Sequence, residues 1–319
     1  MRLLICTQTV DSSDPVLGFF HRWVEEFAKH ADQVIVICLR KGVHSLPKNV
    51  EVISLGETNR IVRALELCTI IVGRRSEYDT VFVHMNPEYI AAAGWLWRLL
   101  GKKIGLWYTH KSVDLKLRIA ARLANVVMTA SKESFRLSTA SPVIIGHGID
   151  TDFFTPDTKT QRGTHILSVG RLMKSKRHDL IIRAAKKAGR VLRIAGDGPE
   201  RLMLERIKKE EGDVVEFLGG LTQDELRDEY RQAAHFVHAS TTGSMDKVVL
   251  EAAACDCNVI TTTWGLYDSI PVQSVSDTPD AIAEAILATP RVSADRVSII
   301  REKHSLKGCI EKIIWNLRK

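Results

Sequence analysis

The sequence is poor in the features that mark several large classes of protein. It has nine prolines and no low-complexity tract, and 45% of its residues are hydrophobic against 26% charged. This composition argues against disordered and fibrous proteins. No run approaches the roughly 18 apolar residues of a membrane-spanning helix, and Arg98 interrupts the nearest one, Tyr89 to Leu100. A soluble globular protein remains, and 319 residues are enough for two domains.

Cysteine is sparse and wrongly spaced for a redox or metal site. The six cysteines are scattered, most of them inside apolar runs, and a single residue separates Cys255 from Cys257. This spacing argues against a zinc or redox pair, and the scatter argues against a disulfide framework. The apolar start of the chain stops at Thr7, too early for a signal peptide. We therefore predict a cytoplasmic protein.

The chain carries an excess of basic residues, with a net charge of +7 and a pI near 9.1. An anionic partner, whether nucleic acid, phospholipid or nucleotide sugar, would account for this charge, and so would a solvated surface with no partner. Basic residues are not interleaved with aromatic ones as they are in nucleic-acid-binding segments. We therefore predict no nucleic-acid partner.

Runs of Val, Ile and Leu alternate with amphipathic segments along the chain, which predicts parallel sheets covered by helices on both faces. The clearest helix is expected from Val16 to His30. The pattern stops between Asp150 and Gly163, a polar stretch with the composition of a connector. We predict an α/β protein with two doubly wound domains, residues 1–155 and 156–319. The expected strands are residues 3–7, 34–39, 50–54, 80–84, 104–109, 126–130 and 143–146 in the first domain, and 165–169, 191–195, 214–218, 235–238 and 258–262 in the second.

Ligands bind beyond the carboxyl ends of the strands in such sheets, so the residues that follow each strand are candidates for a site. The segment Gly170 to Arg177 of the second domain places four cations between a strand and a helix amino terminus. A pyrophosphate suits this position, because Arg171 can bind phosphate oxygens with two hydrogen bonds and Lys176 adds a mobile charge. A solvated basic loop is the alternative.

Two further segments of the second domain invite a functional interpretation. Gly196 lies in a strand-to-helix turn, and such a turn needs glycine with or without a ligand. Glu251 lies in the middle of an otherwise apolar helix, Lys247 to Cys255. A buried carboxylate is costly unless it is hydrogen-bonded, and ribose hydroxyls are suitable donors. A salt bridge to an arginine, or exposure on one edge of the helix, is the alternative.

Taken together, these segments resemble the retaining glycosyltransferase family 4. The resemblance rests on Ile166–Leu172 with Lys176, Arg193–Glu200, Val215–Gly219 and Leu250–Ala254, which occur in the order and spacing seen in that family. It covers residues 165–265 strongly and the first half of the chain weakly. It implies the GT-B fold, in which two doubly wound Rossmann-like domains face each other across a cleft.

The resemblance also implies roles for individual residues of the second domain. Arg171 and Lys176 would hold the donor diphosphate, Glu251 would bind the ribose, and the segment around Phe217 and Leu218 would meet the base. The donor-binding set that we predict is Gly18, Arg171, Lys176, Gly196, Phe217, Leu218, Gly243, Ser244, Met245, Val248 and Glu251.

The chain departs from the family pattern at one position. The family usually has a first glutamate eight residues before the second, and Gly243 stands there instead. Backbone amides of Gly243, Ser244 and Met245 would replace its contact with the donor sugar in part. Asp246 would either replace the lost carboxylate or cap the following helix.

Three residues of the first domain are candidates on the same grounds. Gly18 lies where the family often has glycines against the donor phosphate, and ordinary loop packing is the alternative. His110 follows the strand 104–109 and aligns with a family histidine near the donor sugar, where it would donate hydrogen bonds; a plain surface histidine is the alternative. His84 ends the strand 80–84 and is predicted on the acceptor side, unless it only satisfies local backbone groups. The predicted catalytic residues are His110, Arg171 and Lys176.

We predict a retaining glycosyltransferase that moves a sugar from a UDP- or GDP-linked donor to a hydroxyl group of a glycan or lipid-linked acceptor. The basic loop would stabilise the leaving diphosphate in place of a metal ion, so no metal and no cofactor are expected. Asp150 and Asp152 fit a metal-binding DxD pattern but lie in the connector without further ligands. A non-catalytic nucleotide-sugar binding protein, favoured by Gly243, and a sugar-nucleotide epimerase of similar architecture are the alternatives.

Two neighbouring segments of the first domain predict peripheral contact with an anionic membrane at its inner face. Residues 89–103 combine two tryptophans with a basic end, and residues 111–122 form a basic amphipathic pattern. Ordinary helices that cover a sheet also have an apolar stripe and a polar edge, and this is the alternative.

Overall fold

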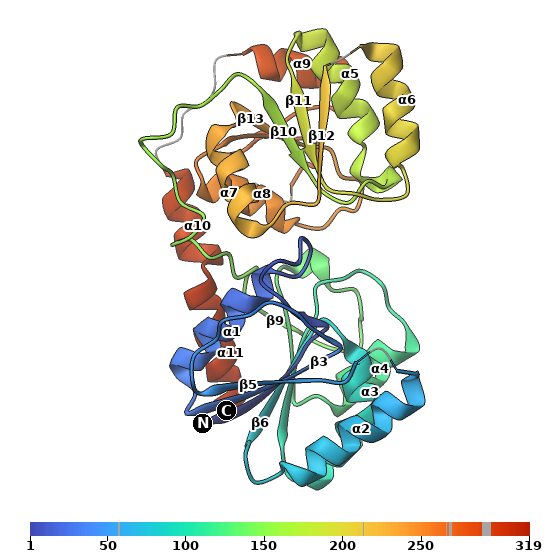
Figure 1. The fold of residues 1–319 in the computed structure, drawn as a ribbon, viewed down its shortest axis with the longest axis vertical. Helices are drawn as coiled ribbons and strands as arrows, with labels where there is room; N and C mark the ends of the chain where they lie inside the picture. Colours follow the sequence, from blue (N-terminus) through green and yellow to red (C-terminus); the bar gives the residue numbers. More distant parts are fainter. Residues whose placement is uncertain (57, 213, 266, 268–269, 289–294) are drawn as a thin grey trace. The chain divides into compact units, whose positions relative to one another are not determined.

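The computed structural model describes residues 1–319 except 57, 213, 266, 268–269 and 289–294. The chain forms two compact units, residues 1–148 with 306–319 and residues 149–305 (Figure 1). The second unit therefore begins at Ile149, before the predicted connector. Residues 306–319, which we placed in the second domain, belong to the first unit.

The first unit is built on a parallel sheet of seven strands in the order β5-β3-β1-β6-β7-β8-β9. The strands are β1 (Arg2–Cys6), β3 (Gln33–Cys38), β5 (Val50–Ser54), β6 (Thr80–His84), β7 (Lys103–Trp107), β8 (Val126–Thr129) and β9 (Val143–Ile144). The central strands are buried on both faces, which explains why they are continuous apolar runs in the sequence. A short pair, β2 (Thr9–Val10) and β4 (Arg40–Lys41), was not predicted.

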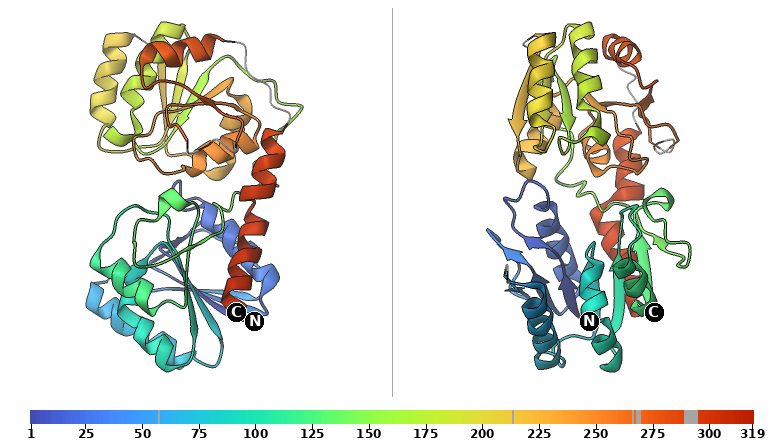
Figure 2. Two further views of the ribbon diagram at one scale, coloured as in Figure 1. Left: turned by 180° about the vertical axis from the view of Figure 1, so that it is seen from behind. Right: turned by 90° about the vertical axis from the view of Figure 1, so that its right-hand side faces the viewer.

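Two layers of helices cover this sheet. Helices α2 (Arg60–Gly73), α3 (Pro87–Leu99) and α4 (Leu115–Leu123) pack on one face, and α1 (Phe19–His30) and α11 (Leu306–Arg318) pack on the other. The red α11 runs beside the blue α1 in Figure 2. Its buried residues Cys309, Ile310 and Ile313 share one apolar cluster with α1. The predicted domain boundary was wrong for residues 306–319, because α11 is the second helix that covers the sheet face beside α1.

The second unit is built on a parallel sheet of six strands in the order β12-β11-β10-β13-β14-β15. The strands are β10 (Ile166–Val169), β11 (Leu192–Ala195), β12 (Val215–Gly219), β13 (His235–His238), β14 (Asn258–Thr261) and β15 (Gln273–Ser274). Helices α5 (His178–Ala188), α6 (Arg201–Glu211) and α9 (Pro279–Leu287) cover one face. Helices α7 (Gln223–Gln232), α8 (Lys247–Ala254) and α10 (Arg296–His304) cover the other. Both units thus confirm the predicted α/β, doubly wound architecture.

The strand order reverses once in each sheet. The reversal lies between β1 and β6 in the first unit and between β10 and β13 in the second. Loops that follow such a pair of strands diverge to opposite faces of the sheet and leave a crevice, where ligands of these folds bind. These two places are therefore the candidate sites.

Candidate functional site

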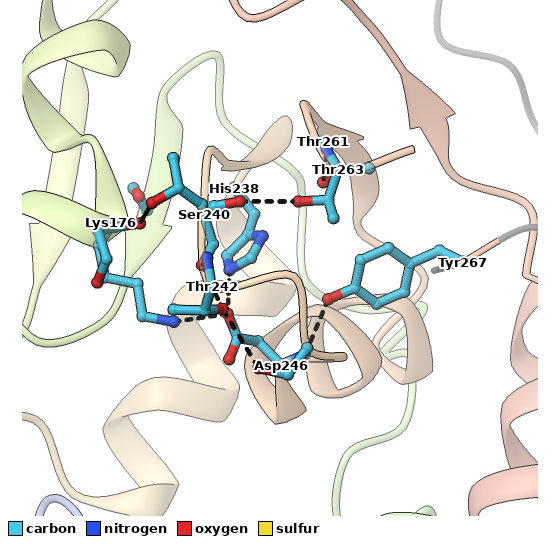
Figure 3. A network of polar contacts seen from close by, with 12 residues as sticks. Lys176, His238, Ser240, Thr242, Asp246, Thr261, Thr263 and Tyr267 are labelled. Carbon is cyan, nitrogen blue, oxygen red and sulfur yellow. Dashed lines mark hydrogen bonds and ion pairs between the residues drawn. The ribbon is translucent and has the colours of Figure 1, made fainter. Parts of the chain in front are cut away.

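The candidate site of the second unit lies at the carboxyl ends of the neighbouring strands β10 and β13. The loop after β10 leads through a short 3-10 helix, η2 (Lys174–Lys176), into α5, and the loop after β13 leads into α8. Thr241 N donates a hydrogen bond of 2.9 Å to Ser175 O and so joins the two loops. Figure 3 shows the polar side chains that meet between them.

Glycines in the adjacent loop, after β11, fix the path of the basic loop. A Cβ atom at Gly196 would lie 2.2 Å from Gly170 O, and one at Gly198 would lie 2.4 Å from Leu172 O. The loops are also linked by a hydrogen bond of 3.0 Å from Leu172 N to Asp197 O. The backbones approach too closely for any side chain at Gly196, so the turn itself requires this glycine.

Of the two predicted phosphate-binding cations, Lys176 is anchored and Arg171 is exposed. Lys176 Nζ donates a hydrogen bond of 2.5 Å to Asp246 Oδ2, and the Lys176 side chain is 16% exposed. Arg171 lies on the surface of the loop, and in the part of the chain that the structure describes its guanidinium forms no ion pair. The loop therefore presents one lysine that Asp246 holds in place and one exposed arginine.

Asp246 is the centre of the polar network in Figure 3. Its carboxylate accepts the bond from Lys176 and another of 2.7 Å from His238 Nε2, while its backbone N–H donates to Tyr267 Oη over 2.8 Å. Burial alone would raise the pKa of Asp246, but the hydrogen bond from His238 and the charge of Lys176 hold it well below its usual range. Asp246 occupies the N-cap position of α8 without a capping bond from its side chain. The carboxylate thus serves the network rather than the helix.

Two buried histidines beside this network have ring nitrogens without hydrogen-bond partners among the described residues. His238 uses Nε2 on Asp246, which leaves Nδ1 as an acceptor when the ring is neutral. His178 lies with Nδ1 3.3 Å from Ser168 Oγ, and its Nε2 has no partner. Burial, followed by the charges of His238 and Lys176, lowers the pKa of His178 to about 4, so this ring is neutral at pH 7.

The loop after β13 carries Gly243, the residue that stands where the family has its first glutamate. Gly243 has φ 61°, a left-handed conformation that favours glycine. Ser244 Oγ donates a hydrogen bond of 3.3 Å to Thr242 Oγ1, so this hydroxyl is engaged within the loop. Met245 is 9% exposed and packs in the core beneath α8. The Ser244 hydroxyl still has the capacity to accept a hydrogen bond, so the donors that this segment offers to a ligand are its backbone N–H groups.

Glu251 is buried in the middle of α8, with 3% of its surface exposed. Burial raises its pKa, while the charge of Lys247 and a hydrogen bond of 3.3 Å from Tyr230 Oη act against that rise. Among the described residues no arginine forms a salt bridge with Glu251. Neither a salt bridge to an arginine nor exposure on the edge of the helix therefore explains this carboxylate. Its oxygens retain the capacity to accept hydrogen bonds from hydroxyl groups.

The residues predicted to meet a base lie on β12, which is one of the two edge strands of the sheet. The pairing of β11 with β12 shifts after Phe217, so that Leu218 bulges. Phe217 packs toward the helices α5 and α6, whereas Leu218 packs toward α7 and α8 with Val248. The guanidinium of Arg201 lies 4.3 Å from the ring centroid of Phe217 and covers its face. The structure does not bring Phe217 and Leu218 to one surface.

Two candidates of the first unit have structural explanations. His84 is 1% exposed, and its ring centroid lies 4.1 Å from that of Phe20 and 5.1 Å from that of Trp107. The prediction that His84 lines an acceptor site is wrong, because α1 covers the end of β6. Gly18 is buried, and a Cβ atom there would lie 2.5 Å from Asp14 O. Loop packing therefore requires this glycine.

His110, the third candidate of the first unit, is exposed after β7. Ser112 N donates a hydrogen bond of 3.1 Å to its Nδ1. A neutral ring that accepts at Nδ1 carries its proton on Nε2, which is then available to donate. This tautomer suits the predicted role of a hydrogen-bond donor.

The DxD pattern of the connector has a local structural role. Asp150 Oδ1 accepts hydrogen bonds of 3.2 Å from the backbone N–H groups of Asp152 and Phe153. Within the described residues there is no group of three or more His, Cys, Asp or Glu side chains placed to hold a metal ion. Asp150 orders the turn that starts the second unit.

Residues 163–289 contain the whole network around Asp246 together with Glu251, and they match the family model described as Glycosyl transferases group 1. This part of the chain is a group 1 glycosyltransferase domain.

Two curated relatives also match part of the chain. The chain is 30% identical over 148 residues to the phosphatidylinositol N-acetylglucosaminyltransferase gpi3 subunit of Schizosaccharomyces pombe, covering 44% of this chain and 32% of the relative. It is 29% identical over 171 residues to the D-inositol 3-phosphate glycosyltransferase of Mycobacteroides abscessus, covering 45% of this chain and 39% of the relative. The matches therefore span only 32% and 39% of the length of these relatives.

Solved structures show the fold of the whole chain. HepE of Anabaena in complex with UDP and glucose superposes with a TM-score of 0.76 at 15% identity, over 100% of both chains. Sucrose-phosphate synthase of Thermosynechococcus elongatus gives 0.75 at 16% identity, over 100% of this chain and 98% of the other. The chain has the expected GT-B fold. None of its described helices has the length and apolar character to cross a membrane.

Three polar residues in or beside the network of Asp246, namely His178, His238 and Tyr267, were not predicted from the sequence. His238 ends a predicted strand and His178 follows the basic loop, so their positions held a signal. Tyr267 lies in an irregular segment after β14 and contacts Asp246 only through the tertiary fold. No local pattern identifies such a residue.

Proposed function

We propose that the protein is a glycosyltransferase that moves a sugar from a UDP- or GDP-linked donor to a hydroxyl group. The observation that carries this proposal is the anchored Lys176 at the switch point of the group 1 domain, beside the amino terminus of α8 and the exposed Arg171. Two cations and a helix amino terminus suit a diphosphate. Glu251 offers carboxylate oxygens to ribose hydroxyls. UDP in the HepE complex supports a nucleotide donor.

In this proposal the reaction proceeds with retention and without a metal ion or other cofactor. Negative charge develops on the diphosphate as the bond to the sugar breaks, and Lys176, Arg171 and the N–H groups of α8 stabilise it. His110 donates from Nε2 to an oxygen of the sugar or phosphate. The leaving phosphate accepts the proton of the attacking hydroxyl.

We further propose a glycan or lipid-linked acceptor and a peripheral position at the anionic inner face of a membrane. Both curated relatives are named after a compound that contains an inositol phosphate group. These compounds are phosphatidylinositol, which is a phospholipid, and D-inositol 3-phosphate. Helices α3 and α4 leave Trp95 56% exposed and Leu115 70% exposed, while Trp97 is fully buried. These helices therefore cover the sheet and present apolar side chains outward.

Gly243 favours a second candidate function, a protein that binds a nucleotide sugar without transferring it, because a glycine gives the sugar no carboxylate contact. Isothermal titration with UDP-, GDP- and ADP-linked sugars tests the donor site, and release of free nucleotide with and without candidate acceptors tests transfer. Binding of a nucleotide sugar together with acceptor-dependent release supports the transferase. Binding without release supports the second candidate, and no binding to any donor contradicts both.

A further inference from the structure

A cavity of about 440 Å³ opens in the first unit at its own switch point. Gln8 follows β1 and Asn86 follows β6, the two strands between which the order reverses, and both residues line the cavity. Leu39 and Leu55, which follow β3 and β5, complete the wall beside the sheet. Ligands of doubly wound folds bind at this place, and the volume falls in the usual range of small-molecule sites, about 300–1,000 Å³.

Helix α2 forms the opposite wall with one of its faces. Arg60, Arg63, Ala64 and Leu67 line the cavity, and their spacing of three and four residues places them on one side of the helix. The side chain of Asn59 accepts the N–H groups at the start of α2 and fixes its first turn. Arg60 and Arg63 belong to that turn, so their backbone positions are set by the cap.

The lining of this cavity has more positive than negative charge. Its charged residues are Arg60, Arg63, Glu88 and Lys116. Lys116 Nζ donates a hydrogen bond of 2.8 Å to Glu88 Oε1, so these two charges balance. Across the stretches of chain that the structure describes, no carboxylate pairs with the guanidinium of Arg60 or Arg63. Two guanidinium groups match the oxygens of a phosphate better than a neutral sugar.

An apolar strip lies on α2 next to its cavity face. Ile61 is 74% exposed, Val62 is 44% exposed and Leu65 is 65% exposed. Ile61 and Leu65 are one helical turn apart and therefore neighbours on the surface. Exposed apolar residues that cluster mark contact sites, and a strip beside basic residues is typical of helices that lie in the boundary layer of a bilayer.

We infer that the cavity binds the phosphate-bearing headgroup of a membrane lipid, and that the strip of Ile61, Val62 and Leu65 contacts the bilayer that supplies this lipid. The inference rests on the proposed function, in which the lipid is the class of acceptor. Membrane contact would then lie on α2, whereas the sequence predicted it for residues 89–103 and 111–122.

Vesicle flotation of the full chain tests the inference, with phosphatidylcholine vesicles that do or do not contain phosphatidylglycerol. The wild type should bind only the anionic vesicles. The double variant Arg60→Glu and Arg63→Glu should lower this affinity about tenfold or more, because each cation near an anionic surface contributes to binding. Ile61→Ser with Leu65→Ser should lower it as well, whereas circular dichroism should show that both variants remain folded.

Matched controls come from α6 in the second unit. Arg206→Glu with Lys209→Glu makes the same change of charge at exposed positions, and Leu202→Ser with Met203→Ser removes apolar side chains that are 72% and 37% exposed. Both should bind vesicles within about twofold of the wild type. Equal losses in the α2 and α6 charge variants would overturn the inference, because binding would then follow net charge alone.

A second arm separates a lipid from a soluble phosphate compound. Titration with glycerol 3-phosphate should show weak binding that Arg60→Glu with Arg63→Glu abolishes. If the α2 variants lose glycerol 3-phosphate but bind vesicles normally, the acceptor is soluble and the inference is overturned. UDP-sugar titration runs in parallel, so a failed donor site and a failed cavity are distinguishable.

Discussion

Asp246→Asn tests the idea that a buried carboxylate anchors the phosphate-binding lysine. The change removes the charge and keeps the size of the side chain that accepts bonds of 2.5 Å from Lys176 and 2.7 Å from His238. The side chains of Asp246 and His238 are only 22% and 4% exposed, so water screens them little. A hydrogen bond to a charged group contributes about 1.5–3 kcal/mol, and asparagine can still accept one bond. At about 2–4 °C per kcal/mol, the melting temperature should fall by about 3–12 °C in calorimetry at pH 7.

Asp280→Asn is a matched control. Asp280 accepts a bond from Lys187 Nζ over the same 2.5 Å, but these side chains are 69% and 51% exposed. Exposed pairs contribute only about 0–1 kcal/mol, so the control should lose less than about 4 °C. Equal losses in the two variants would refute the reasoning, because burial would then add nothing to the network of Asp246.

The difference in stability between the wild type and Asp246→Asn should also depend on pH, with a definite sign. The pKa of Asp246 is lowered in the folded state, so its stabilisation is fully present above the ordinary aspartate pKa of about 3.9 and is lost as the pH falls below that value. The stability difference between wild type and Asp246→Asn should stay constant from about pH 5 to 8 and shrink below about pH 4. A difference that is unchanged at about pH 3 would contradict this assignment.

Further predictions concern the donor site, the dependence on metal ions, and the histidines His84 and His110 of the first unit. Arg171→Ala and Glu251→Ala should each weaken UDP- or GDP-sugar binding about tenfold or more, and calorimetric titration at wild-type affinity for both would exclude this donor site. Turnover should continue in excess EDTA, and loss of activity that Mg²⁺ or Mn²⁺ restores would show that a metal ion takes part. His110→Ala should lower turnover about a hundredfold at unchanged melting temperature, and a stable variant with full activity would remove it from the mechanism. His84→Ala should instead lower the melting temperature, because it opens a cavity against Phe20 and Trp107.

All seven strands of the first sheet and five of the six strands of the second could be predicted from the sequence, whereas β15 (Gln273–Ser274) was not predicted. A parallel strand that is buried on both faces is a continuous apolar run, as in Leu3 to Cys6 beside Val34 to Ile37. Other elements depend on partners distant in sequence. The pair β2 and β4 joins Thr9 to Arg40, and α11 packs against a helix made almost three hundred residues earlier. Local periodicity carries no information about either partner.

Some residues of the candidate site could likewise be predicted from the sequence, and others could not. Glu251 could be recognised as buried because the residues around it in the helix are apolar. The role of Asp246 remained open, because its partners Lys176 and His238 lie 70 and 8 residues away and their geometry decides between a cap and an ion pair. The burial of His84 could not be predicted, because the end of a strand is often exposed, whereas here Phe20 covers this residue.

The position of α11 sets an order for folding during synthesis. Residues 149–305 interrupt the first unit, so the whole second unit has been made before residues 306–319 emerge from the ribosome. Units of this kind fold as their own residues become available. The half of the protein that is translated first is therefore the last to complete its core, and until α11 arrives the apolar surface beside Trp23 and Phe27 is open to other chains. A nascent chain that stalls before Leu306 would carry a finished group 1 domain on an unfinished partner, and quality-control factors that bind exposed apolar surface would find it there.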